Sequence, residues 1–121
     1  MSGSQLLELA TQGAQDGRVT VKVAGDLDAA YAHRLYDTVK RLDLHVGEHL
    51  DLHLEDVTFL DTVGASVLAA SRQLAVDRGC AFSISAPSLQ CRAVLELVGL
   101  GRLLPSLDDS LEALPGMLPL I

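Results

Sequence analysis

The amino-acid sequence predicts an α/β domain with a mixed, mostly parallel, four- to five-stranded sheet and helices mainly on one face. Strand-like and helix-like segments alternate from residue 18 onward, an order that produces parallel strands joined by right-handed crossovers. The strands themselves alternate apolar and polar residues, which favours one buried face and one solvated face. With 121 residues, of which 49% are hydrophobic, the chain suits a single hydrophobic core.

The first half of the chain predicts a hairpin followed by a helix. A weak strand over residues 6–10 precedes a strong one over 18–24, and the short, glycine-containing connection between them favours an antiparallel pair. A helix is expected over 29–42, with Asp28 as its N-cap. Its apolar stripe has helical spacing and consists of Ala32, Leu35, Val39 and Leu42.

The second half continues the alternation of strand and helix. A third strand is indicated over 49–54, and the apolar run after it ends at Asp61 and Thr62, where a helix to about Asp77 begins. A strand over 80–86 and a helix over 89–98, capped by Ser88, come next. The buried stripes of these helices are expected to be Val63, Val67, Ala70 and Leu74 in the earlier one, and Cys91, Val94, Leu95 and Val98 in the later one.

The end of the chain predicts a short helix over 108–114 and an apolar tail over 115–121 that is broken by prolines. No linker in the sequence is long enough to divide the chain. Residues 1–121 are therefore interpreted as one domain with its core over residues 5–112.

The junction between Asp61 and Gly64 combines features of a helix cap and of an anion site. Asp and Thr side chains accept hydrogen bonds from the free N–H groups of a first helical turn, and a phosphate on Thr62 would suit the positive end of the helix. Gly64 leaves room for another molecule to approach closely. An Asp-Thr pair at this place is more often only a cap, so both interpretations remain open. The turn over residues 25–28 also joins a strand to a helix, so it should lie at the same end of the domain.

Composition excludes several classes of function. A net charge of −7 argues against nucleic acids and anionic membrane surfaces as partners. No apolar run approaches the roughly 18 residues of a membrane span, and the N-terminus lacks the basic start of a signal peptide. Cys80 and Cys91 have no metal spacing and are interpreted as core thiols in a reducing cytoplasm. Three histidines, His45, His49 and His53, are not expected to converge on a metal, because His45 precedes the strand and His49 and His53 lie about 13 Å apart along it.

Three segments carry a resemblance to a known family. They are Val23-Ala24-Gly25-Asp26-Leu27-Asp28, the run from Asp51 to Gly64, and Ala93 to Leu100 ending in Leu103-Leu104-Pro105. Together they resemble the STAS domain, most of all a bacterial anti-sigma factor antagonist, over residues 5–112. The resemblance implies a STAS-type sheet and a regulatory protein that is neither an enzyme nor dependent on a cofactor.

The resemblance also implies a partner and a switch. The partner would be an anti-sigma factor that is also a Ser/Thr kinase, and phosphorylation of Thr62 would end binding until a phosphatase restores it. A homodimer is a further possibility. The implied partner-binding residues are Asp26, Leu27, Asp28, Asp61, Thr62, Val63, Gly64, Ala65 and Ser66.

Departures from the family pattern leave alternatives open. Thr62 stands where simple antagonists usually have serine, which also fits a STAS scaffold of stress signalling or an accessory subunit of a lipid ABC transporter, neither with an obligatory phosphorylation cycle. An enzyme-like receiver domain with Asp61 as phospho-acceptor would need a lysine after a late strand. The only lysines are Lys22 and Lys40, which disfavours that class.

Overall fold

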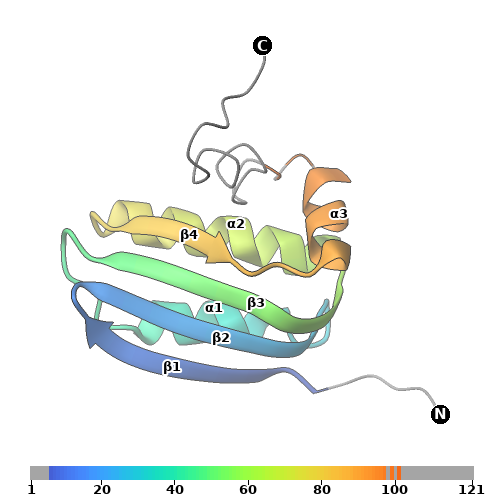
Figure 1. Cartoon of the computed structure of the whole chain (residues 1–121), viewed down its shortest axis with the longest axis horizontal. Coiled ribbons are helices and arrows are strands. Elements are labelled where there is room, and N and C mark those ends of the chain that lie inside the picture. Colours follow the sequence, from blue (N-terminus) through green and yellow to red (C-terminus); the bar gives the residue numbers. More distant parts are fainter. Residues whose placement is uncertain (1–5, 98, 100, 102–121) are drawn as a thin grey trace, which may run out of the picture.

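Two helices cover one face of a four-stranded sheet in the computed structural model of this chain (Figure 1). The structure describes residues 6–97, 99 and 101. The strands are β1 (Glu8–Gln15), β2 (Arg18–Leu27), β3 (His49–Leu60) and β4 (Ala81–Ser85), and they lie side by side in chain order. The helices are α1 (Ala32–Arg41), α2 (Thr62–Asp77) and α3 (Leu89–Leu97). Because β1 pairs antiparallel with β2 while β2–β3 and β3–β4 pair parallel, the predicted mixed, mostly parallel sheet is confirmed.

The opening hairpin is longer than the sequence pattern indicated. Strand β1 begins at Glu8 and continues to Gln15, with an irregularity between Gln12 and Gln15 where Gly13 lies. The chain reverses at Asp16 and Gly17, whose φ angles of 55° and 79° are those of a tight hairpin turn. The predicted strand over 6–10 was therefore placed too early, because this turn and not the upstream leucines sets the pairing.

Helix α1 starts three residues later than expected. Asp28 does not cap the helix directly, since its Oδ1 accepts from the backbone N–H groups of Ala30 and Tyr31 in a turn that precedes the first helical residue. The buried positions Ala32, Leu35 and Val39 confirm the predicted stripe up to the C-cap.

The bounds of α2 were predicted correctly, but its buried face was not. The predicted stripe of Val63, Val67, Ala70 and Leu74 lies next to the real one, which consists of Gly64, Ala65, Leu68, Ser71 and Ala75. Val63 is 44% exposed, whereas Val67 and Leu74 pack at the border of the core. The small residues face the sheet because they let the helix backbone approach it closely, so size and not hydrophobicity alone decides the orientation.

The far ends of α1 and α2 are joined by Arg78, which follows the last residue of α2. Its guanidinium donates to the backbone carbonyl of Leu42 at 3.0 Å and to that of Lys40 at 2.9 Å. These carbonyls belong to the C-terminal end of α1 and have no acceptor role inside the helix. A side chain from one helix therefore caps the other.

The last two described elements are the short strand β4 and helix α3. Strand β4 pairs only with His49–His53, and α3 packs against β3 with Cys91 and Leu95 in the core. Ser88 caps α3 as predicted, since its Oγ accepts from the backbone N–H of Cys91 at 3.1 Å. Both cysteines are free and buried, as expected. The predicted helix over 108–114, the tail over 115–121 and the predicted core position Val98 lie outside the described residues.

Candidate functional site

The turn after β2 and the turn after β3 meet at one end of the sheet, on the right in Figure 1. The backbone N–H of Asp61 donates to the carbonyl of Leu27 at 3.4 Å, and the N–H of Ala29 donates to Asp61 Oδ2 at 3.1 Å. The sequence-based prediction that these turns lie at the same end is therefore confirmed. Parallel β2 and β3 bring their carboxyl ends together there, as in other open α/β sheets.

Asp61 is the N-cap of α2, and both of its carboxylate oxygens accept hydrogen bonds from the backbone. Oδ1 accepts from the N–H of Gly64 at 2.8 Å, while Oδ2 accepts from Ala29 across the turn. Its own carbonyl accepts from the N–H of Ala65 at 2.9 Å. The negative charge of Asp61 thus lies at the positive end of the helix dipole, where it is stabilised.

Gly64 is needed for contact within the chain. A Cβ at this position would lie 2.7 Å from Leu60 Cδ1 and closer still to the carbonyl oxygen of Leu27. The expectation that Gly64 leaves room for another molecule was therefore wrong, because the backbone of β2 already occupies that space. The absence of a side chain instead allows the start of α2 to pack on the end of β2.

The exposed part of the site lies on the first turn of α2. Thr62 and Ser66 are exposed, and Ser66 Oγ donates to the carbonyl of Thr62 at 2.9 Å. Val63 and Phe59 are each 44% exposed. Phe59 was not among the site residues predicted from the sequence. The pattern that could have indicated it is a large aromatic residue just before the end of a strand. Because side chains alternate along a strand and Leu60 is buried, Phe59 points away from the helices.

Most of the other predicted site residues are buried and position the exposed ones. Leu27 and Ala65 belong to the core, and Asp26 is 8% exposed with its Oδ1 accepting from Thr58 Oγ1 at 2.9 Å. Asp28 is half-buried and holds the turn before α1 through Oδ1. The surface at this end of the sheet therefore presents hydroxyls and apolar side chains, and the carboxylates of Asp28 and Asp61 support it by accepting from backbone N–H groups.

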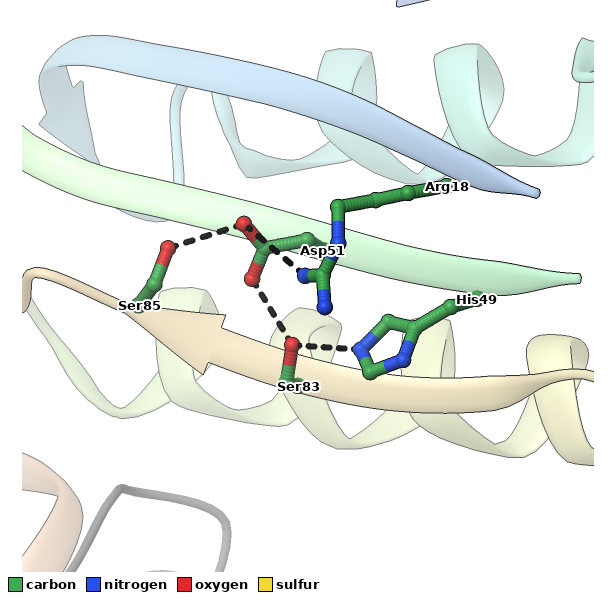
Figure 2. A network of polar contacts seen from close by, with 5 residues as sticks. All are labelled: Arg18, His49, Asp51, Ser83 and Ser85. Carbon is green, nitrogen blue, oxygen red and sulfur yellow. Dashed lines mark hydrogen bonds and ion pairs between the residues drawn. The ribbon is translucent and has the colours of Figure 1, made fainter. Parts of the chain in front are cut away.

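A second polar cluster lies on the open face of the sheet (Figure 2). Asp51, only 6% exposed, accepts from Ser83 Oγ at 2.8 Å and from Ser85 Oγ at 2.9 Å, and Arg18 lies 3.9 Å from the carboxylate. His49 Nε2 is 2.7 Å from Ser83 Oγ. Burial lowers the pKa of His49, and the nearby charge of Arg18 lowers it further, while Asp51 opposes both.

The direction of these hydrogen bonds argues against nucleophilic catalysis at Ser83. A serine hydroxyl has one hydrogen, and Ser83 donates it to Asp51, so its oxygen must accept from His49 Nε2–H. A catalytic serine needs the opposite arrangement, with histidine between serine and carboxylate as the base. The order in this cluster is histidine, serine, carboxylate, which gives a structural network.

The described part of the chain contains neither a metal-binding cluster nor a membrane-spanning helix. In that part, no group of three or more His, Cys, Asp or Glu side chains could hold a metal ion. Within the same residues, no helix is long and apolar enough to cross a membrane. His49 and His53 have separate neighbours, Ser83 and Glu55 respectively.

Comparison with known proteins places this fold in a family. The family model described as "Mlab, STAS domain" matches residues 10–105. The chain belongs to the STAS domain family. A comparison with curated protein sequences finds no match to this STAS domain.

Solved structures resemble this STAS domain closely. An anti-sigma factor antagonist from Mycobacterium paratuberculosis is 28% identical with a TM-score of 0.72, covering 93% of this chain and 97% of its own. The antagonist SpoIIAA in its unphosphorylated form is 17% identical with a TM-score of 0.62, covering 93% of this chain and 100% of its own. The phosphorylated form of SpoIIAA, a Bacillus cell fate determinant, is 16% identical with a TM-score of 0.60, covering 88% and 98%. The two SpoIIAA structures support the fold alone.

Proposed function

We propose that this STAS domain is an anti-sigma factor antagonist that binds a kinase-type anti-sigma factor in the cytoplasm and is switched off by phosphorylation of Thr62. The observation that carries the proposal is the exposure of Thr62, the first residue of α2, at the end of the sheet where the two turns meet. The likeness to the mycobacterial antagonist over nearly the whole of both chains supports the same role.

Phosphorylation would act through charge at the interface. The dianion is favoured by roughly 0.3–1 kcal/mol at a helix N-terminus. The carboxylate of Asp61 already occupies that place and opposes the new charge, so the two local effects partly cancel. The free domain should therefore keep its fold when Thr62 is phosphorylated.

The partner would experience the phosphate differently. An interface built around a neutral hydroxyl and the half-exposed Val63 would have to bury about −1.5 to −2 units of charge without a matched cation. A penalty of about 3 kcal/mol would weaken binding more than a hundredfold, since 1.4 kcal/mol corresponds to a factor of ten. This difference is large enough to release the partner.

The test begins with affinity capture of the partner from the native cell, followed by calorimetry with the purified partner. Thr62→Glu should weaken binding, and Thr62→Ala should bind normally but lose its response to the kinase. Val76→Glu is the control and should bind normally, because it adds one negative charge at an exposed position near the other end of α2, away from Thr62. Equal affinities of the phosphorylated and unmodified domains would reject the switch.

A second candidate is an accessory subunit of a lipid ABC transporter that binds its partner without a phosphorylation cycle. The pair Asp61-Thr62 favours this candidate, because simple antagonists usually have serine where this chain has Thr62. Capture of an ATPase as the partner, together with unchanged binding after phosphorylation of Thr62, would support the accessory role over the switch.

A further inference from the structure

The two ends of the open face of the sheet, taken along the strands, carry opposite charges. This face lies opposite α1 and α2, in front of them in Figure 1. Strand register places Arg18 beside His49 at the end of the face where β2 and β3 begin. At the other end Glu8 pairs with Ala24, which pairs with Asp56.

The basic end carries accessible positive charge. The Arg18 side chain is 52% exposed, and its contact with Asp51 at 3.9 Å is longer than a hydrogen bond. Because this contact is so long, the guanidinium keeps N–H donors available for another carboxylate.

The acidic end carries accessible negative charge. Glu8, Glu55 and Asp56 are exposed and line one surface hollow together with Ala24 and Thr58. An irregularity in the β2–β3 register between Lys22 and Ala24 makes Glu55 and Asp56 consecutive exposed residues, which concentrates charge at this end. The Glu55 side chain is 69% exposed and only loosely paired with His53, at 3.9 Å.

The two middle levels of the face also carry opposite charges, but in the reverse order to the ends. Asp51 lies at the level of Thr20, and the next level along the strands carries Lys22 beside His53. Levels that lie at equal distances on either side of a line across the strands, between Asp51 and His53, therefore carry opposite charges. A surface of this kind is complementary to itself when one copy is turned end for end.

We propose that a second copy of this chain packs face to face on the open sheet with its strands reversed. A twofold axis along that line lays Arg18 and His49 of each copy over the acidic end of the other, where Glu8, Glu55 and Asp56 lie. The same operation lays the level of Asp51 over the level of Lys22 and His53. Every charged level of the face then meets its opposite.

The side chains of the face suit close packing of two sheets. Small residues lie between the charges, which allows the separation of about 10 Å that is usual for stacked sheets. These small residues are Ala10, Thr20, Ala24, Ala81, Ser83 and Ser85. Covering Asp51 adds little to the free-energy cost of desolvation, because its side chain is already buried and its oxygens already accept hydrogen bonds from the serine hydroxyls.

The size of the face sets the expected affinity. Four strands about 4.8 Å apart and about six residues long give a flat area of roughly 20 Å by 20 Å. This is smaller than the roughly 800 Å² per partner of a standard interface. The net charge of −7 on each copy adds repulsion. We therefore expect a dissociation constant of roughly 10 µM to 1 mM.

The dimer leaves Thr62 free. Thr62 begins α2, which lies on the opposite face of the sheet, so each copy can still bind a partner. The dimer does not depend on the proposed function, and its failure would leave the role of Thr62 unaffected.

Sedimentation equilibrium of the full chain tests the proposal with a charge swap. Arg18→Glu and Glu55→Arg should each raise the dissociation constant at least about tenfold, because each places like charges opposite one another twice in the dimer. The double variant Arg18→Glu/Glu55→Arg should restore dimerisation. Asp77→Arg is the matched control, since it changes the net charge as Glu55→Arg does but lies on α2, away from the face.

Fold is checked in parallel by circular dichroism and denaturant unfolding. If Arg18→Glu is unfolded because two carboxylates then adjoin, Arg18→Gln replaces it and should weaken the dimer less. Added salt should also weaken the dimer of the unaltered chain. A chain that remains monomeric at about 1 mM, where a dimer of the expected affinity would be populated, overturns the proposal. Single variants that dimerise like Asp77→Arg, or a double variant that stays as weak as the single ones, overturn the arrangement of charges.

Discussion

Asp61 holds the turn before α1 to the start of α2, because its Oδ2 accepts from the backbone N–H of Ala29 at 3.1 Å. The other oxygen accepts from Gly64 in the first turn of α2. A single carboxylate thereby fixes the relative position of two segments that are 32 residues apart in the chain. The geometry around Thr62 depends on this one side chain.

Replacing Asp61 should therefore destabilise the domain more than loss of an ordinary cap. Asp61→Ala leaves the N–H groups of Ala29 and Gly64 without their acceptor and should cost about 1–3 kcal/mol of unfolding free energy. Asp61→Asn keeps one acceptor oxygen and should cost less. Urea denaturation measures both, with the exposed Asp77→Ala expected within about 0.5 kcal/mol of the unaltered chain. Equal midpoints for Asp61→Ala and Asp77→Ala would contradict the role of Asp61.

A methyl group at residue 64 should disturb the junction between β2 and α2. Gly64→Ala directs a Cβ into the Leu27 carbonyl and the Leu60 side chain, so we expect a loss of about 1–3 kcal/mol or more. Gly13→Ala is the control, because nothing lies within 4 Å of a Cβ there. Thermal unfolding compares the two. A Gly64→Ala variant as stable as Gly13→Ala would show that α2 does not pack this closely.

Leu68 should be the most sensitive apolar position on α2. It is fully buried, so Leu68→Ala should lower the free energy of unfolding by about 2–5 kcal/mol. Val63→Ala, at a position 44% exposed, should cost far less. Guanidinium titrations of both variants decide the orientation of the helix, and a larger loss for Val63→Ala would restore the face predicted from hydrophobicity.

His49 should make the domain less stable in mild acid. Burial and Arg18 lower the pKa of His49 in the folded state below the usual value of about 6.5, so protons bind the unfolded chain more readily. The contribution of neutral His49 is fully present above pH 6.5 and is lost as the pH falls toward the folded-state pKa. His49→Gln should flatten the decrease in stability between about pH 7 and pH 5, and His33→Gln on the exposed side of α1 is the control for loss of a histidine. Parallel slopes for His49→Gln and the unaltered chain would contradict the prediction.

Strand order and helix bounds were predictable from sequence where local signals agree with packing. The alternating valines of β2 and the Asp61 cap of α2 are local patterns, and the structure contains both. The start of α1 was not predictable in the same way. Asp28 can cap a helix or form a turn, and the choice depends on Asp61, which holds Ala29 from a distant part of the chain.

The meeting of the two turns was predicted from the sequence, but the packing around it was not. The paired turns follow from the polarity of parallel strands, and Thr62 follows from its place after the cap. The close contact of Gly64 with Leu27 and the exposure of Phe59 depend on how β3 meets β2 and α2. A sequence pattern carries no information about such distances, so a glycine beside a site could be interpreted as space for a ligand.

Helix α1 should form late during synthesis of the chain, because its C-terminal end depends on Arg78. Helix α1 has ten residues and no side-chain N-cap, and isolated helices shorter than about 12–15 residues are marginal in water. Its C-terminal carbonyls obtain their donor from Arg78, which is 36 residues after Leu42. A nascent chain that has emerged only through β3 carries α1 without this donor and without α2 to cover it. We therefore expect the amino-terminal half to stay unfolded on the ribosome until Arg78 has emerged, after which both helices fold onto the sheet together.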